Sequence, residues 1–200
     1  MKNSIEKGLT NSYTYKEYKE LIKKMLVEGK STGNEQSESL TNYSLLNDRR
    51  MKRLDKTIQI SEKTIQEIQK ITEPLTWLVI TEGWCGDAAQ NLPVINKIAT
   101  INPLINLQLV LRDENEDLMN QFLTNGNKAI PKLIILNKEY KVIATWGPRP
   151  SIATKMVINY KAAHGNLNPK FKEDLQVWYN KNKGENVQED IVHLIKSTLV

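Results

Sequence analysis

The sequence contains one cysteine in 200 residues, so no disulfide can form within a single chain. It has no apolar run long enough to cross a membrane, and its first residues are polar. These shortages predict a soluble protein of a reducing compartment, with no signal peptide and no membrane partner. We therefore expect a cytoplasmic location.

Histidine is almost as scarce as cysteine, and metal-ligand spacing is missing. The two histidines, His164 and His193, lie far along the chain from the cysteine, so a Cys-His pair is not predicted. No spacing of Cys, His, Asp and Glu is typical of a zinc site. We expect neither a metal nor another cofactor.

The formal net charge is +5, and acidic residues are interspersed with the basic ones. We interpret the densest basic stretch as a solvated helix face. A nucleic-acid surface would need interleaved aromatic residues or a docking motif, and the sequence has neither, so no nucleic-acid partner is expected. The stretch consists of Arg49, Arg50, Lys52 and Arg53, flanked by Asp48 and Asp55.

Helical patterns occupy both ends of the chain. Thr14 and Glu17 form a capping-box pattern that begins one helix, and Gly29 ends it. The polar stretch 29–39 reads as a linker. Further helices are predicted at 40–54, from Ser61, and from two later caps, Asn168 followed by Pro169 and Asn186 followed by Glu189.

The middle of the chain alternates strands and helices. Four strands are predicted, at 75–81, 106–111, 132–136 and 141–146, the last two joined as a hairpin. Helices are predicted after Gly86, at 114–124 and at 151–163. We expect helix-linked strands to run parallel and the closing hairpin antiparallel, giving an α/β fold with helices on both faces of a mixed sheet.

This pattern predicts three segments. Residues 1–60 form a helical N-terminal extension, residues 61–163 form the α/β domain, and residues 164–200 form a helical C-terminal extension packed on the core. The extensions carry apolar faces that need a partner. That partner is the core or a second protein, and the sequence leaves the oligomeric state open.

The single cysteine lies where a strand ends and a helix begins, in the motif Trp84-Cys85-Gly86-Asp87-Ala88. Unpaired amides and the positive end of the helix dipole favour a thiolate there, which predicts a lowered pKa for Cys85. The carboxylate of Asp87 opposes thiolate formation. Asp87 also suits the first turn of a helix for its own sake.

The motif resembles Trp-Cys-Gly-Pro-Cys of the thioredoxin superfamily. Three further features strengthen the resemblance: Pro93 lies eight residues after Cys85, Ile130-Pro131 precedes a strand, and Gly147 follows the last strand. The chain looks most like bacterial thioredoxin family proteins with helical extensions. The resemblance implies a thioredoxin-like mixed sheet and a cis bond before Pro131, facing the cysteine.

The resemblance also implies site residues. Cys85 would be the catalytic nucleophile, and the substrate-binding groove would be lined by Trp84, Gly86, Asp87, Ile130 and Pro131. Ala88 stands in place of the resolving cysteine, so an external thiol would have to release any mixed disulfide. Val79 stands where thioredoxins hold a buried acid, so that proton shuttle is not expected.

These residues predict a monothiol thiol-disulfide oxidoreductase whose partner is a protein thiol or a low-molecular-weight thiol. One alternative is a redox-inactive thioredoxin-fold module that binds a peptide or protein. Another is an inert cysteine inherited from an enzyme. A cluster-binding relative of the glutaredoxins ranks last, because Asp87 and Ala88 depart from Cys-Gly-Phe-Ser. The substrate and the reductant stay open.

Overall fold

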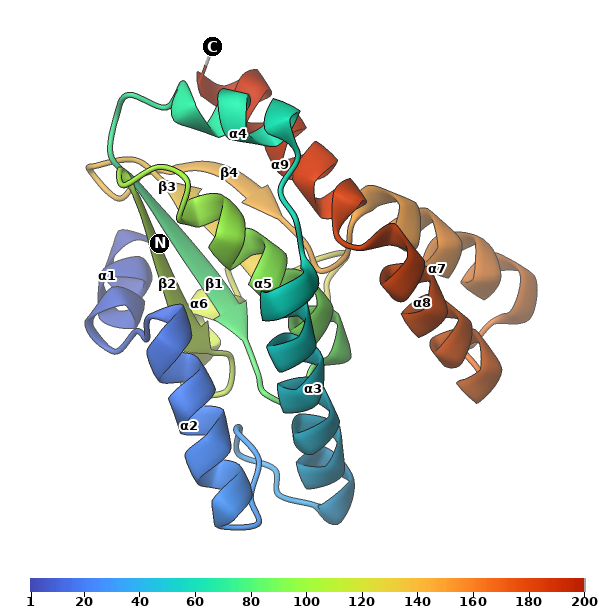
Figure 1. The fold of residues 1–200 in the computed structure, drawn as a ribbon. Helices are drawn as coiled ribbons and strands as arrows, with labels where there is room; N and C mark the ends of the chain where they lie inside the picture. Colours follow the sequence, from blue (N-terminus) through green and yellow to red (C-terminus); the bar gives the residue numbers. More distant parts are fainter. Residues whose placement is uncertain (200) are drawn as a thin grey trace.

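The computed structural model describes residues 1–199. It contains a four-stranded mixed sheet with the strand order β2-β1-β3-β4, covered by helices on both faces (Figure 1). The strands are β1 (Leu75–Thr81), β2 (Ile105–Leu111), β3 (Lys132–Leu136) and β4 (Val142–Trp146). The predicted α/β fold with helical extensions is confirmed.

Strand β1 is central because its sequence is apolar almost without interruption. Trp77, Leu78, Val79 and Ile80 are fully buried, which places both faces of the strand in the core. A strand that alternated polar and apolar residues could bury only one face. Strand β1 therefore ends inside the molecule, and the cysteine motif begins there.

The directions of the strands were predicted only in part. Strand β2 runs parallel to β1, and β4 runs antiparallel to β3, both as predicted. Strand β3, however, runs antiparallel to β1, although a helical segment links it to β2. That helix, α6 (Glu116–Met119), is about 6 Å long, whereas a return along the seven-residue β2 needs about 23 Å. The chain therefore stays at the end of the sheet where β1 and β2 finish, and β3 starts beside the end of β1.

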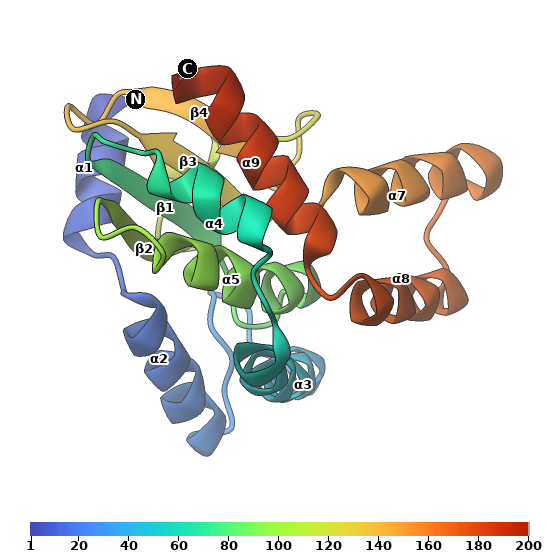
Figure 2. The same ribbon diagram turned by 45° about the horizontal axis from the view of Figure 1, so that its top comes forward.

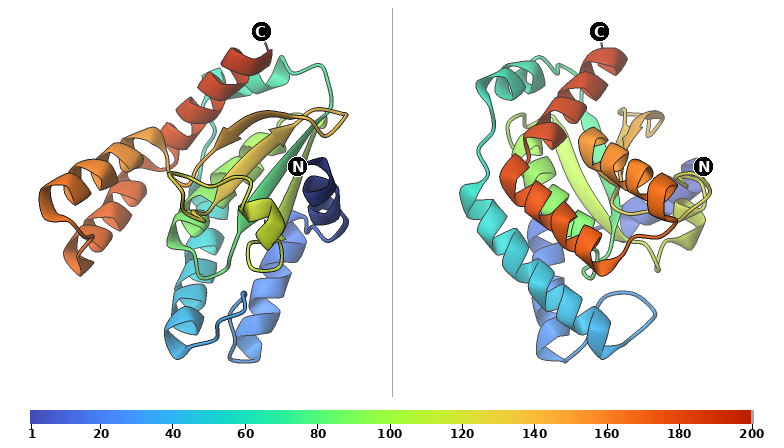
Figure 3. Two further views of the ribbon diagram at one scale, coloured as in Figure 1. Left: turned by 180° about the vertical axis from the view of Figure 1, so that it is seen from behind. Right: turned by 90° about the vertical axis from the view of Figure 1, so that its right-hand side faces the viewer.

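Helices α5 and α9 cover one face of the sheet, with α3 and α4 packed beside them, whereas α1 and α6 lie on the opposite side (Figures 1 and 3). The remaining helices are α1 (Lys2–Thr10), α2 (Tyr15–Val27), α3 (Glu38–Thr57), α4 (Glu62–Gln69), α5 (Gly86–Ala99), α7 (Ser151–His164), α8 (Pro169–Asn182) and α9 (Glu185–Leu199). No helix within residues 1–199 combines the length and the apolar character that a membrane span needs.

Local capping signals were reliable, but not at every helix. The capping box of Thr14 and Glu17 is confirmed, and Asn168 accepts a hydrogen bond from the backbone N–H of Phe171 at 2.8 Å. Helix α1 was not predicted, because only tertiary burial of Ile5 and Gly8 marks its inner face.

Two helix boundaries were predicted wrongly. The helix expected at 114–124 shrinks to the four residues of α6, and the chain after Met119 turns into a loop toward β3. Asn186 lies inside α9 rather than at its cap. Its side-chain oxygen accepts the backbone N–H of Ile152 at 2.9 Å, so it serves the start of α7 instead.

Helices α7 and α8 form a helical hairpin that extends from the body of the molecule (Figure 2). Its apolar side chains form a cluster separate from the main core: Ala153, Val157, Phe171, Leu175 and Tyr179. Helix α9 instead contributes Val187, Ile191 and Ile195 to the main core. The C-terminal helices therefore divide into one that covers the sheet and a hairpin with its own packing.

Candidate functional site

Cys85 is the N-cap of α5, as the sequence predicted. Its Sγ accepts a hydrogen bond from the backbone N–H of Ala88 at 3.4 Å. The thiol in turn donates to the carbonyl oxygen of Ile130 at 3.3 Å. The peptide bond between Ile130 and Pro131 is cis. The fold thus brings the cysteine to the segment that precedes β3, forty-five residues away in the sequence.

The thiol is almost buried, and this corrects the predicted pKa. Cys85 is 8% exposed. Burial, and after it the charge of Asp87, raises the pKa of Cys85 to about 12, although the helix-start amides and Arg149 act in the opposite direction. The prediction of a lowered pKa was wrong, because it considered the helix terminus without the loss of water around the sulfur.

Asp87 is held by two residues from distant parts of the chain. Arg149 Nη2 lies 2.7 Å from its Oδ2, and the hydroxyl of Tyr179 donates to its Oδ1 at 3.0 Å. Burial raises the pKa of Asp87, while the positive charge of Arg149 acts against that rise. Asp87 lies in the first turn of α5, as predicted, but it also joins α8 and the segment after β4 to the motif.

Arg50 belongs to the site rather than to a solvated face. It is half-buried on α3, donates from Nη1 to the side-chain oxygen of Asn47 at 3.0 Å, and lies against Gly86. Burial lowers the pKa of Arg50, and the neighbouring charge of Arg53 adds to the effect. The interpretation as a solvated face was wrong for Arg50 alone, since Arg49, Lys52 and Arg53 are exposed. Helical periodicity does not show which helix packs on α3.

The segment read as a linker holds the loop that precedes the cysteine. Thr32 is buried, and its hydroxyl accepts the backbone N–H of Gly83 at 2.8 Å. On the other side, Asn47 Nδ2 donates to the carbonyl of Gly83 at 3.0 Å. Residues before position 50 therefore fix the backbone of the motif, which sequence analysis did not anticipate.

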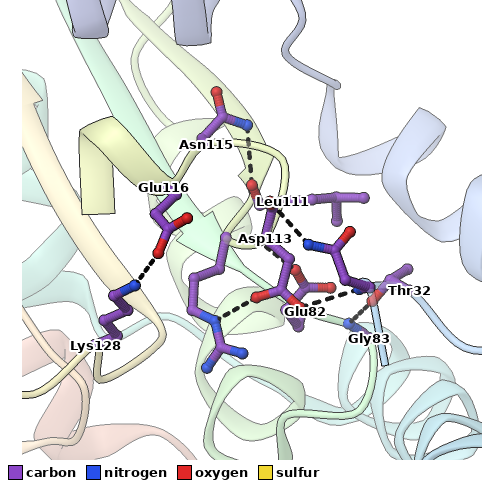
Figure 4. Close-up of polar contacts among 10 residues, drawn as sticks. Thr32, Glu82, Gly83, Leu111, Asp113, Asn115, Glu116 and Lys128 are labelled. Carbon is purple, nitrogen blue, oxygen red and sulfur yellow. Dashed lines mark hydrogen bonds and ion pairs between the residues drawn. The ribbon is translucent and has the colours of Figure 1, made fainter. Parts of the chain in front are cut away.

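Glu82 is a fully buried acid three residues before the cysteine (Figure 4). Its Oε1 accepts the backbone N–H of Asp113 at 3.0 Å. Burial raises the pKa of Glu82, and the charge of Asp113 contributes in the same direction. Sequence analysis sought a buried acid only at Val79, whereas a charged residue between an apolar strand and the cysteine was the available signal.

Trp84 directly precedes Cys85 and is half-buried. The guanidinium of Arg112 lies over its ring, 4.8 Å from the centroid, in a cation–π arrangement. Arg112 Nε also donates to the carboxylate of Asp113 at 2.8 Å, and the backbone N–H of Asp113 is held by Glu82. The prediction that Trp84 lines a substrate groove stays a prediction.

Replacing Glu82 with glutamine is expected to stabilise the protein by an amount that depends on pH. The pKa of Glu82 is raised in the fold, so the wild type loses stability as pH rises above the unfolded value of 4.5, whereas the variant does not. Denaturant unfolding from pH 4 to pH 8 should show a gap that opens in favour of the variant. The matched control is Glu116→Gln, an exposed acid on α6. A gap for Glu82→Gln that is constant or reversed with pH would contradict this interpretation.

Within residues 1–199, no group of three or more His, Cys, Asp and Glu side chains is arranged to hold a metal ion.

The sequence and the fold were compared with those of known proteins. A family model described as thioredoxin matches residues 33–162. A protein of unknown function from Pseudomonas aeruginosa aligns at a TM-score of 0.58 with 18% identity, covering 92% of this chain and 98% of that one. An HIV epitope-scaffold aligns at 0.57 with 18% identity, covering 92% and 99%. No curated protein matches the sequence. At this identity the two structures are similar in fold alone.

Proposed function

This chain belongs to the thioredoxin family, and from that premise we propose that it is a monothiol thiol-disulfide oxidoreductase. Cys85 is the sole nucleophile, and the partner is a protein thiol or a low-molecular-weight thiol. Trp84, Gly86 and Asp87 form one side of the substrate groove, and Ile130 with Pro131 forms the other. An external thiol releases the mixed disulfide, the step that a resolving cysteine would otherwise perform.

One observation carries the proposal. The sulfur of Cys85 caps α5 and lies 3.3 Å from the carbonyl oxygen of Ile130. A disulfide that reached this sulfur would therefore pass between the helix start and the backbone of Ile130. Once Cys85 has lost its proton, the carbonyl of Ile130 no longer accepts from the thiol, and in this proposal it pairs with an extended substrate segment, as in strand addition.

The reaction has two exchange steps. The Cys85 thiol loses its proton to solvent, and its thiolate attacks a disulfide R–S–S–R′ to form Cys85–S–S–R and release R′–S⁻. A second thiolate, R″–S⁻, then attacks the R sulfur, which forms R–S–S–R″ and returns Cys85 as the thiolate. The number of disulfide bonds is conserved in each step, so no other oxidant or reductant is needed.

Turnover with a mixed disulfide tests this function. A glutathionylated peptide in excess reduced glutathione is expected to lose its glutathione faster with the wild-type protein than without it. The Cys85→Ser variant is expected to give only the uncatalysed rate. Equal rates for wild type, Cys85→Ser and buffer would exclude the oxidoreductase function for this substrate class.

A second function, a redox-inactive module that binds a peptide or protein, is favoured by the burial of the thiol. The pKa of Cys85, about 12, leaves almost no thiolate at neutral pH in this conformation. The two functions differ in what Cys85→Ser does. A binding module keeps its full affinity for partner in that variant, whereas capture through a mixed disulfide is lost.

A further inference from the structure

We propose that the α7–α8 hairpin is a gate over the Cys85 site, and that Tyr179 is the positioning residue that holds it closed. While closed, the gate restricts the thiol to small reagents; when open, it admits a disulfide carried on a larger chain. The role of the gate in admitting a substrate rests on the proposed function. The contacts that define the gate do not depend on any catalytic activity.

The hairpin is built to move as one body. Its two helices pack on each other through a cluster of their own, in which Phe171 stacks on Tyr160 with ring centroids 4.1 Å apart. None of the five buried members of that cluster belongs to the main core. Rotating the hairpin away therefore leaves its internal packing intact.

Helix α8 meets the motif through polar contacts. The Tyr179 hydroxyl donates to Asp87, and Gln176 Oε1 accepts from Gln90 Nε2 at 2.9 Å. Gln176 also lies against Gly86, the residue next to the thiol. Contacts of this kind can be exchanged for water at small net cost, which is why polar interfaces between structural units permit relative motion.

The base of the hairpin, in contrast, is anchored. Asp190 on α9 accepts hydrogen bonds from the backbone N–H of Ser151 at 2.8 Å and from Trp146 Nε1 at 3.0 Å. These bonds fix the start of α7 to the body, whereas the turn between α7 and α8 lies at the far end of the hairpin (Figure 2). Gln176 and Tyr179 lie in the last turns of α8, toward this base, so opening requires a pivot of the hairpin that parts Tyr179 from Asp87.

Alkylation of the only thiol measures the gate without any exchange chemistry. Intact mass follows the rate at which native protein reacts with iodoacetamide, a small reagent, and with a maleimide joined to a bulky polymer. Tyr179→Phe removes the bond to Asp87, and it is expected to raise the bulky-reagent rate about tenfold more than the small-reagent rate. A change in thiolate fraction alone would raise both rates by the same factor.

The matched control is Tyr160→Phe, which removes a hydroxyl from the same hairpin away from the motif. It should leave both rates at the wild-type values. The gate proposal would be overturned if Tyr179→Phe changed the rates of both reagents by the same factor. It would also be overturned if the ratio of the bulky-reagent rate to the small-reagent rate were the same in the two variants. Failure of the turnover test above, with the size effect present, would instead remove the oxidoreductase function and leave the gate.

Hydrogen exchange on the wild type gives a check that depends on no variant. The amides of α8 are expected to exchange together and much faster than those in the middle of α5 and α9. Protection of α8 equal to that of α9 would also overturn the proposal.

Discussion

An Asp87→Asn variant is expected to react with iodoacetamide at Cys85 about tenfold faster than the wild type at pH 8. The carboxylate of Asp87 is, after burial, the largest cause of the raised pKa of Cys85. Removing a neighbouring negative charge lowers the pKa of a thiol by about one unit. At a pH well below that pKa, each unit by which the pKa falls raises the thiolate fraction about tenfold. The positive charge of Arg149 is then unopposed and acts in the same direction.

The control for this prediction is Asp174→Asn, the same change at an exposed residue of α8 that pairs with Lys170. It should leave the rate unchanged. Thermal unfolding of each variant must show a cooperative transition above the assay temperature, because an unfolded chain would also react quickly. A rate equal to or below that of wild type in folded Asp87→Asn would refute the electrostatic account of the thiol.

Replacing Gly147 with alanine is expected to destabilise the protein by about 3 kcal/mol or more. Gly147 adopts a φ of +111°, and a Cβ there would lie 2.2 Å from the carbonyl oxygen of Pro131. Because the carbonyl of Pro131 is part of the backbone, it cannot move away from the added Cβ as a flexible side chain could. The segment after β4 therefore depends on glycine to pass this close to Pro131.

Gly126→Ala separates the cost of a positive φ from the cost of the clash with Pro131. Gly126 also has a positive φ, +75°, but nothing lies within 4 Å of an added Cβ. Its substitution is expected to cost only about 1 kcal/mol, the price of the left-handed backbone. Denaturant unfolding of both variants checks this, and similar losses at the two positions would mean that the contact with Pro131 contributes nothing.

The fold could be predicted to the extent that its signals are local. The apolar run of β1, the capping box of Thr14 and the strand-to-helix position of Cys85 each follow from a few neighbouring residues. The direction of β3 could not be predicted in this way. It depends on the length of α6, and that helix is short because the chain after Met119 turns toward β3.

The residues of the site were likewise predicted only where their signals are local. The motif predicted Cys85 and its neighbours, and the resemblance to thioredoxins supplied Ile130, whose carbonyl the thiol reaches. Arg50, Arg149 and Tyr179 were missed, because each comes from an element whose packing has no local signal. The raised pKa of Cys85 was missed for the same reason, since burial is a property of the whole fold.

The central claim is that this nearly buried sulfur exchanges disulfides in the folded protein. Intact mass of native wild-type chain incubated with oxidised glutathione at pH 8 tests it most directly. The account predicts a single glutathione adduct, absent from Cys85→Ser and removed by excess reduced glutathione. A native chain that stays unmodified while the denatured chain is fully modified would contradict it.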